Sequence, residues 1–161
     1  MAYLERAIHR LARELDRIAQ WALVAMMALI VINIILRFTW RPILGVYEFV
    51  SFLGAVVISF ALAYCAVQRG HIAVTLLVDQ LPPRTQAIID IAVNSIIITF
   101  FGLATWQVVL YATDILLSGE VSPTTMTPFY PFVYGVAIGL LVLCLVLLVD
   151  LSKSIAKAVR R

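Results

Sequence analysis

Glu48 is the residue whose type and position most clearly point to chemistry, because it stands inside a long apolar run. Carrying a carboxylate into the middle of a bilayer costs at least about 2.5 kcal/mol, so acidic residues in such runs often couple transport to ions or protons. Glu48 lies near the start of its run, however, seven residues after Arg41 and eleven after Arg37. We therefore predict an ion pair with one of these arginines or a contact with a partner protein that docks there. Ion or proton coupling is the alternative for Glu48, and solvated loop charges are the alternative for the arginines.

Three more polar residues lie at the ends of apolar runs. Asn33, four residues before Arg37, is placed to hydrogen-bond a neighbouring helix, which contributes about 0.6 kcal/mol in a membrane. Arg69 and His71 follow the run that contains Glu48. There Arg69 can reach phospholipid head groups, and His71 can cap a helix at the membrane surface. All of these side chains are predicted to make contacts, not to catalyse.

The other reactive residues do not form a catalytic pattern. Cys65 and Cys144 are far apart and lack the clustered Cys/His spacing of a redox or metal site, so packed thiols are predicted. A haem held by two histidines needs an imidazole inside the membrane on each of two helices, and neither His9 nor His71 meets that need. Ser-His-Asp, Walker and HExxH patterns are also missing. We expect a protein that is not an enzyme and that holds no cofactor or metal.

The composition identifies lipid as the solvent of this chain. Of its 161 residues, 63% are apolar and 13% are charged, and the mean hydropathy is +1.04. Soluble domains have about 45–50% apolar and about 25% charged residues. These values exclude a soluble enzyme and a nucleic-acid-binding protein. We predict a single membrane domain over residues 1–161.

Four apolar segments are long enough to cross a bilayer, which takes about 20 helical residues. The predicted spans cover about 18–36, 46–68, 88–113 and 130–150. Ten of the twelve Lys and Arg lie in the terminal segments and in the loop after the second span. By the positive-inside rule both termini are then cytoplasmic. The predicted fold class is an all-α membrane protein with four transmembrane helices.

Two amphipathic segments are expected at the membrane surface. In residues 1–17 the arginines repeat on one face, and apolar residues recur every three or four positions on another. That apolar set is Leu4, Ile8, Leu11, Leu15 and Ile18. This pattern predicts a helix that lies on the inner leaflet, attracted by anionic lipid, before the chain turns into the first span. A second short surface helix is predicted over 74–81, and Pro83 is expected in the first turn of the helix that follows.

Two further features predict contacts between helices. Polar residues are too frequent in the third span for every face to meet lipid, so one face is expected to meet protein. These residues are Asn94, Ser95, Thr99, Thr105 and Gln107. Gly135 and Gly139 form a GxxxG pair in the fourth span, and such small residues allow close approach of helices.

The segment from Ala63 to Leu77 resembles a hallmark of the small membrane subunit of tripartite ATP-independent periplasmic (TRAP) transporters. Residues 69–77, RGHIAVTLL, are similar to the R-G-H-I-x-V-D-x-L run that closes the second helix in that family. Thr75 replaces the usual Asp, so a polar role is not carried over to this position. The resemblance extends over residues 18–150, through the N-x-x-x-R-F ending of the first span, Glu48 and the proline-rich segment before the fourth span.

This resemblance implies a subunit without transport activity of its own. Family members pair with a large membrane subunit that moves the substrate by an elevator-type motion, and with a periplasmic binding protein that delivers an organic acid such as a C4-dicarboxylate or a sialic acid. An ion gradient, usually sodium, supplies the energy through the large subunit. The small subunit is expected to widen the stationary scaffold in a bacterial or archaeal inner membrane, surrounded by phospholipid.

Two other functions remain open from the sequence. A self-contained, homo-oligomeric exporter could use Glu48 for proton coupling. A membrane anchor for electron transfer would carry a haem, for which the required histidines are not found.

Overall fold

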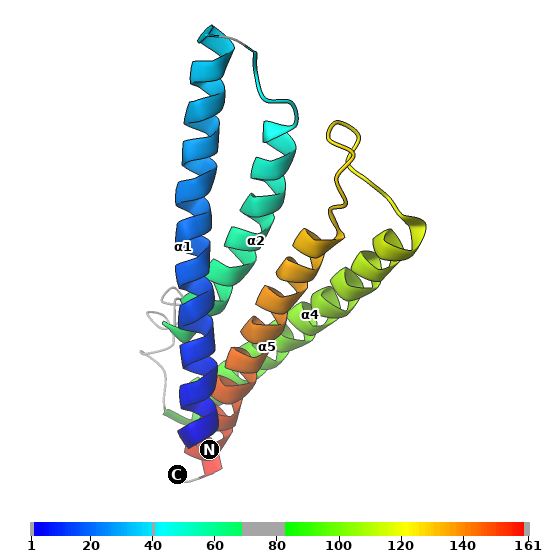
Figure 1. Cartoon of the computed structure of the whole chain (residues 1–161). Helices are drawn as coiled ribbons and strands as arrows, with labels where there is room; N and C mark the ends of the chain where they lie inside the picture. The colour runs from blue at the N-terminus through cyan, green and yellow to red at the C-terminus, as the bar shows by residue number, and fades with distance from the viewer. Residues whose placement is uncertain (1, 40, 69–82, 160–161) are drawn as a thin grey trace.

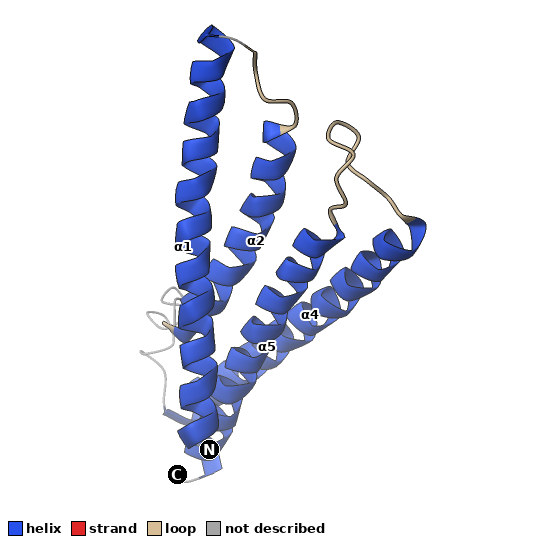
Figure 2. Cartoon of the chain, in the orientation of Figure 1, coloured by secondary structure: helices blue, strands red, loops and turns tan. Residues whose placement is uncertain are grey.

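The computed structural model describes residues 2–39, 41–68 and 83–159, and these form a bundle of four helices (Figures 1 and 2). The helices are α1 (Ala2–Thr39), α2 (Val46–Val67), α4 (Pro83–Ser118) and α5 (Tyr130–Val159). Each contains a stretch that is long and apolar enough to cross a membrane. The predicted class, an all-α membrane protein with four such helices, is confirmed.

The two ends of the bundle carry different parts of the chain. Both termini lie at one end (Figure 1), which we call the terminal end. The opposite end, the loop end, carries the α1–α2 loop (residues 41–45) and the α4–α5 loop (residues 119–129). That the terminal end faces the cytoplasm stays a prediction. The surface helix predicted over 74–81 falls outside the described residues.

Helix α1 runs without interruption for 38 residues, so the prediction of a separate surface helix over 1–17 that turns into the first span is wrong. No Gly or Pro occurs between Ala2 and Thr39 to break the helix. Most of its buried and half-buried positions form one stripe, spaced alternately four and three residues apart: Ile8, Ala12, Leu15, Ala19, Ala22, Met26, Leu29, Asn33 and Leu36. Because this stripe faces the bundle along nearly the whole helix, α1 is held straight by its packing.

The apolar residues at the beginning of α1 divide between the bundle and the exposed surface of the helix. Ile8 and Leu15 are buried in the bundle, whereas Leu11 and Ile18 are 47% and 55% exposed. The face that packs also uses Ala12 and Ala19, both of which are buried. Small side chains at a helix crossing let the two backbones approach closely.

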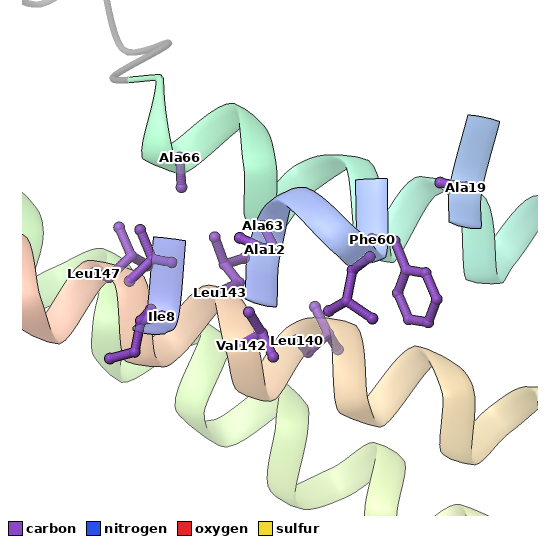
Figure 3. Close-up of a cluster of buried hydrophobic side chains, with 12 residues drawn as sticks. Ile8, Ala12, Ala19, Phe60, Ala63, Ala66, Leu140, Val142, Leu143 and Leu147 are labelled. Carbon is purple, nitrogen blue, oxygen red and sulfur yellow. The ribbon is translucent and has the colours of Figure 1, made fainter. Parts of the chain in front are cut away.

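The main core lies where α1 packs against α2 and α5 (Figure 3). Its α1 residues, Ile8 to Ala19, come from the amino-terminal half of that helix. Alanines from α1 and α2 meet larger aliphatic residues of α5 there. The cluster contains Ile8, Ala12, Leu15, Ala19, Phe60, Ala63, Ala66, Leu140, Val142, Leu143, Val146 and Leu147. Helices α1, α2 and α5 therefore form a packed unit, to which α4 is attached mainly through α5.

The GxxxG pair lies at the crossing of α2 and α5, as its small residues predicted. A Cβ atom added to Gly139 would lie 2.7 Å from Ser59 Oγ and 2.9 Å from the Ser59 carbonyl carbon. A Cβ atom on Gly135 would lie 3.2 Å from Val56 Cγ2. At Gly139 the two helices approach so closely that a larger residue would collide with Ser59.

Candidate functional site: the loop clamp and the exposed face of α4

Glu48 connects the beginning of α2 to the α4–α5 loop at the loop end of the bundle. It lies in the first turn of α2, and its carboxylate accepts hydrogen bonds from three residues of the α4–α5 loop. Ser122 Oγ donates to Oε2, Thr125 Oγ1 donates to Oε2 at 3.1 Å, and the backbone N–H of Thr124 donates to Oε1 at 3.1 Å. Both carboxylate oxygens are therefore engaged. We call Gly45, Glu48, Ser122, Thr124 and Thr125 the loop clamp.

Gly45 makes the close approach of the two loops possible. It precedes α2 with φ of 80°, a left-handed conformation that is costly for residues with a Cβ atom. A Cβ atom at this position would also overlap Thr125 Cγ2. Both the backbone angle and the neighbouring threonine thus require glycine here.

The α4–α5 loop is itself folded into a small hairpin. The N–H of Ser122 donates to Thr127 O at 3.0 Å, and the N–H of Met126 donates to Ser122 O at 3.0 Å. The hydroxyls of Thr125 and Thr127 lie 2.6 Å apart. Ser122 is fully buried under this turn. The hairpin therefore presents a fixed set of donors to Glu48.

An aromatic stack beneath the clamp was not anticipated from the sequence. The ring of Phe52 stacks on Phe129 and on Phe132, with ring centroids 5.5 Å apart in both pairs. The sequence spacing could have indicated it, because Phe52 follows Glu48 by four residues and therefore lies on the same face of α2. The stack and the clamp together attach the beginning of α5 to the beginning of α2.

The ion pair predicted for Glu48 with Arg37 or Arg41 is not formed among the described residues, whereas the alternative contact with a partner protein stays a prediction. Within the described chain the Glu48 carboxylate contacts hydroxyls and an amide, and both arginines are exposed. Asn33 does form a hydrogen bond, but to a loop and not to a neighbouring helix: the N–H of Ile43 donates to Asn33 Oδ1 at 2.9 Å. Asn33 thus fastens the α1–α2 loop to α1.

The other two site residues predicted from the sequence, Arg69 and His71, fall outside the described residues. Their expected contacts with head groups and with a helix end stay predictions.

The hydrogen bonds of the loop clamp hold the α4–α5 loop against α2. Two hydroxyl groups and a backbone amide donate hydrogen bonds to one carboxylate. Among the described residues, no three His, Cys, Asp or Glu side chains are grouped so that they could hold a metal ion. The sulfur of Cys144 lies 3.8 Å from the Thr105 hydroxyl, in the contact between α5 and α4. These contacts can fix the position of helices and loops.

Helix α4 carries a second surface of interest. Its face turned away from α5 exposes large apolar residues at helical spacing, among them Ile96, Phe100, Leu103 and Leu110. Gln107 lies on the same face, exposed, and the described chain offers its side-chain amide no hydrogen-bond partner. The exposed Thr99 differs, because its hydroxyl donates to Ser95 O of its own helix at 2.9 Å.

A comparison with protein families shows what kind of chain carries these features. The family model described as tripartite ATP-independent periplasmic transporters, DctQ component, matches residues 5–157. The chain belongs to this family. DctQ proteins are components of a transporter and not enzymes, and the resemblance seen in the sequence is thereby confirmed at family level. No curated protein and no solved structure matches the chain. The loop clamp and the exposed α4 face are thus features of a DctQ-family membrane component.

Proposed function

We propose that this DctQ-family chain is the non-catalytic scaffold subunit of a TRAP transporter. In this proposal a large partner subunit moves an organic acid, such as a C4-dicarboxylate or a sialic acid, across the inner membrane of a bacterium or archaeon. A periplasmic binding protein delivers the substrate, and the ion gradient, usually of sodium, acts on the large subunit. The observation that carries the proposal is the family match across residues 5–157.

The use of polar groups in the bundle supports a scaffold. Glu48 has three donors from the α4–α5 loop, and Asn33 accepts from the α1–α2 loop. A carboxylate that couples transport to protons must exchange them during each cycle. Glu48 instead holds the α4–α5 loop against α2, which suits a part that stays still while a neighbour moves.

The exposed face of α4 is the surface that we assign to the large subunit. Gln107 lies seven residues before Asp114, so it is about 10 Å along the helix from that charge and inside the hydrocarbon layer. An amide in lipid without a hydrogen-bond partner is unfavourable. A transmembrane helix of the large subunit that offers a polar group at this depth would satisfy it, whereas an acyl chain would not.

Replacing Gln107 by leucine should weaken association with the large subunit about threefold, which corresponds to the loss of about 0.6 kcal/mol for one hydrogen bond between membrane helices. The measurement is the amount of large subunit that co-purifies with the tagged small subunit at matched expression. Thr99→Val is the matched control, since its hydroxyl bonds within α4, and it should leave association unchanged. Equal effects of the two substitutions would contradict the assignment of this face.

Reconstitution into liposomes tests the proposed function directly. Uptake of a labelled C4-dicarboxylate or sialic acid should require the large subunit, the binding protein and an imposed sodium gradient, and the small subunit alone should transport nothing. In the assembled complex, Glu48→Gln should keep most of the uptake per complex, because glutamine retains an acceptor for the clamp. A self-contained exporter predicts the opposite pattern: transport by the isolated chain that Glu48→Gln abolishes.

A further inference from the structure

The basic residues of α1 form a charged face that points away from the bundle. Arginines at positions i, i+4, i+7 and i+11 share one face of a helix, and all four are exposed. They are Arg6, Arg10, Arg13 and Arg17. The opposite face carries the buried residues of the core, from Ile8 to Ala19. Because α1 continues straight into its span, these arginines are arranged along the helix axis and not flat on a surface.

Farther along α1 the same face becomes aliphatic. Continuing the spacing from Arg17 leads to exposed residues without polar groups: Val24, Ala28, Val31 and Ile35. Trp21, which is 76% exposed, lies at the transition from arginine to aliphatic residues. Tryptophan is enriched at membrane–water interfaces. The boundary of the hydrocarbon layer on this face therefore lies close to Trp21.

The helical rise places each arginine at its own depth below this boundary. At 1.5 Å per residue, Arg17 lies about 6 Å and Arg13 about 12 Å beyond Trp21, whereas Arg10 and Arg6 lie about 16 and 22 Å beyond it. The head-group layer of one leaflet is about 5–8 Å thick. Long arginine side chains reach back toward the membrane. Arg17 is thus in the phosphate layer and Arg13 at its edge, while Arg10 and Arg6 are in water.

We propose that Arg13 and Arg17 bind the phosphates of anionic phospholipids in the leaflet at which the amino terminus lies, and that this contact sets the depth of α1. A guanidinium matches a phosphate with two parallel hydrogen bonds. Arg17 donates through Nη1 to Glu14 at 2.8 Å, which leaves other N–H groups of its five for a phosphate. Opposite charge and the change from arginine to aliphatic residues at one level together favour a lipid bilayer over a soluble anion.

The test compares two double variants that remove the same charge from the same face. The full-length chain is placed in nanodiscs of phosphatidylcholine with a minority of phosphatidylglycerol, and the enrichment of phosphatidylglycerol around the protein is measured by native mass spectrometry. About 1 kcal/mol per basic residue near the surface corresponds to about fivefold in binding. Arg13→Gln with Arg17→Gln should reduce the enrichment by more than fivefold, and Arg6→Gln with Arg10→Gln should change it less than twofold.

The controls separate lipid binding from binding of a soluble anion and from contact with a protein partner. Arg13→Lys with Arg17→Lys keeps the charge and should keep most of the enrichment, and an unchanged melting temperature shows that a variant is folded. Equal losses in both glutamine variants, or no loss in either, would overturn the proposal. So would competition by added inorganic phosphate in the native chain, which would indicate a soluble anion. Loss of co-purifying large subunit with lipid enrichment intact would indicate a protein partner and would also overturn it.

Discussion

Replacing Gly139 by leucine should disrupt the packing of α2 against α5 and lower the stability of the bundle. A Cβ atom there would lie 2.9 Å from both the Ser59 carbonyl carbon and Phe60 Cδ1, and Ser59 and Phe60 are themselves buried. A helix backbone cannot move aside as a flexible side chain can. Insertion of extra groups into a packed core costs about 1–3 kcal/mol, and leucine adds a whole side chain at the closest point. Thermal unfolding in detergent, followed by tryptophan fluorescence, measures the loss.

Gly102 provides the matched control for Gly139. It lies inside α4, and a Cβ atom added to it would meet nothing within 4 Å. Gly102→Leu makes the same change in composition in another membrane helix. It should leave the melting temperature unchanged or raise it slightly, because glycine within a helix costs roughly 0.5–1 kcal/mol relative to alanine. Similar losses in the two variants would show that the α2–α5 crossing is not the sensitive point.

Replacing Gly45 by alanine should release the α4–α5 loop from α2. Alanine in the left-handed conformation costs about 1–2 kcal/mol, and its Cβ atom would overlap Thr125 Cγ2. Both effects act at the loop clamp, so the hydrogen bonds to Glu48 should be lost before the helices separate. Hydrogen–deuterium exchange should therefore accelerate at the amides of Ser122, Thr124 and Met126, with little change in the centre of α5.

A double substitution separates the two reasons for Gly45. Thr125→Ser removes Cγ2 and keeps the hydroxyl that donates to Glu48, so by itself it should have little effect. Combined with Gly45→Ala, it should restore the part of the loss that comes from the overlap and leave the part that comes from the backbone angle. If the double variant exchanges as fast as Gly45→Ala alone, the contact with Thr125 does not explain the requirement for glycine.

Gly45 and Glu48 both contact residues of the α4–α5 loop that are far from them in the sequence. Glu48 and Ser122 are 74 residues apart. Sequence reasoning paired Glu48 with Arg37 and Arg41 because they are near in the chain and opposite in charge. The three donors of the α4–α5 loop satisfy the carboxylate instead, and only the pairing of α2 with α5 brings them within reach.

What the sequence determined by itself was the number and the class of the helices. Transfer of a segment into lipid depends on its own side chains, and its backbone must form a helix because lipid offers no hydrogen bonds. Four apolar runs were therefore sufficient to predict four helices, and Pro83 was correctly placed in the first turn of α4 because its effect on the backbone is local. The orientation of the bundle in the membrane stays a prediction from charge.

Tertiary structure alone decided which faces meet. Residues 1–17 have a pattern that suits a membrane surface and a bundle equally well, and α1 continues straight because α2 and α5 offer partners for Ile8, Ala12 and Leu15. In lipid, helix contacts depend on close packing of small side chains and on paired polar groups. These energies belong to two helices at once, so they cannot be assigned until the neighbouring helix is known.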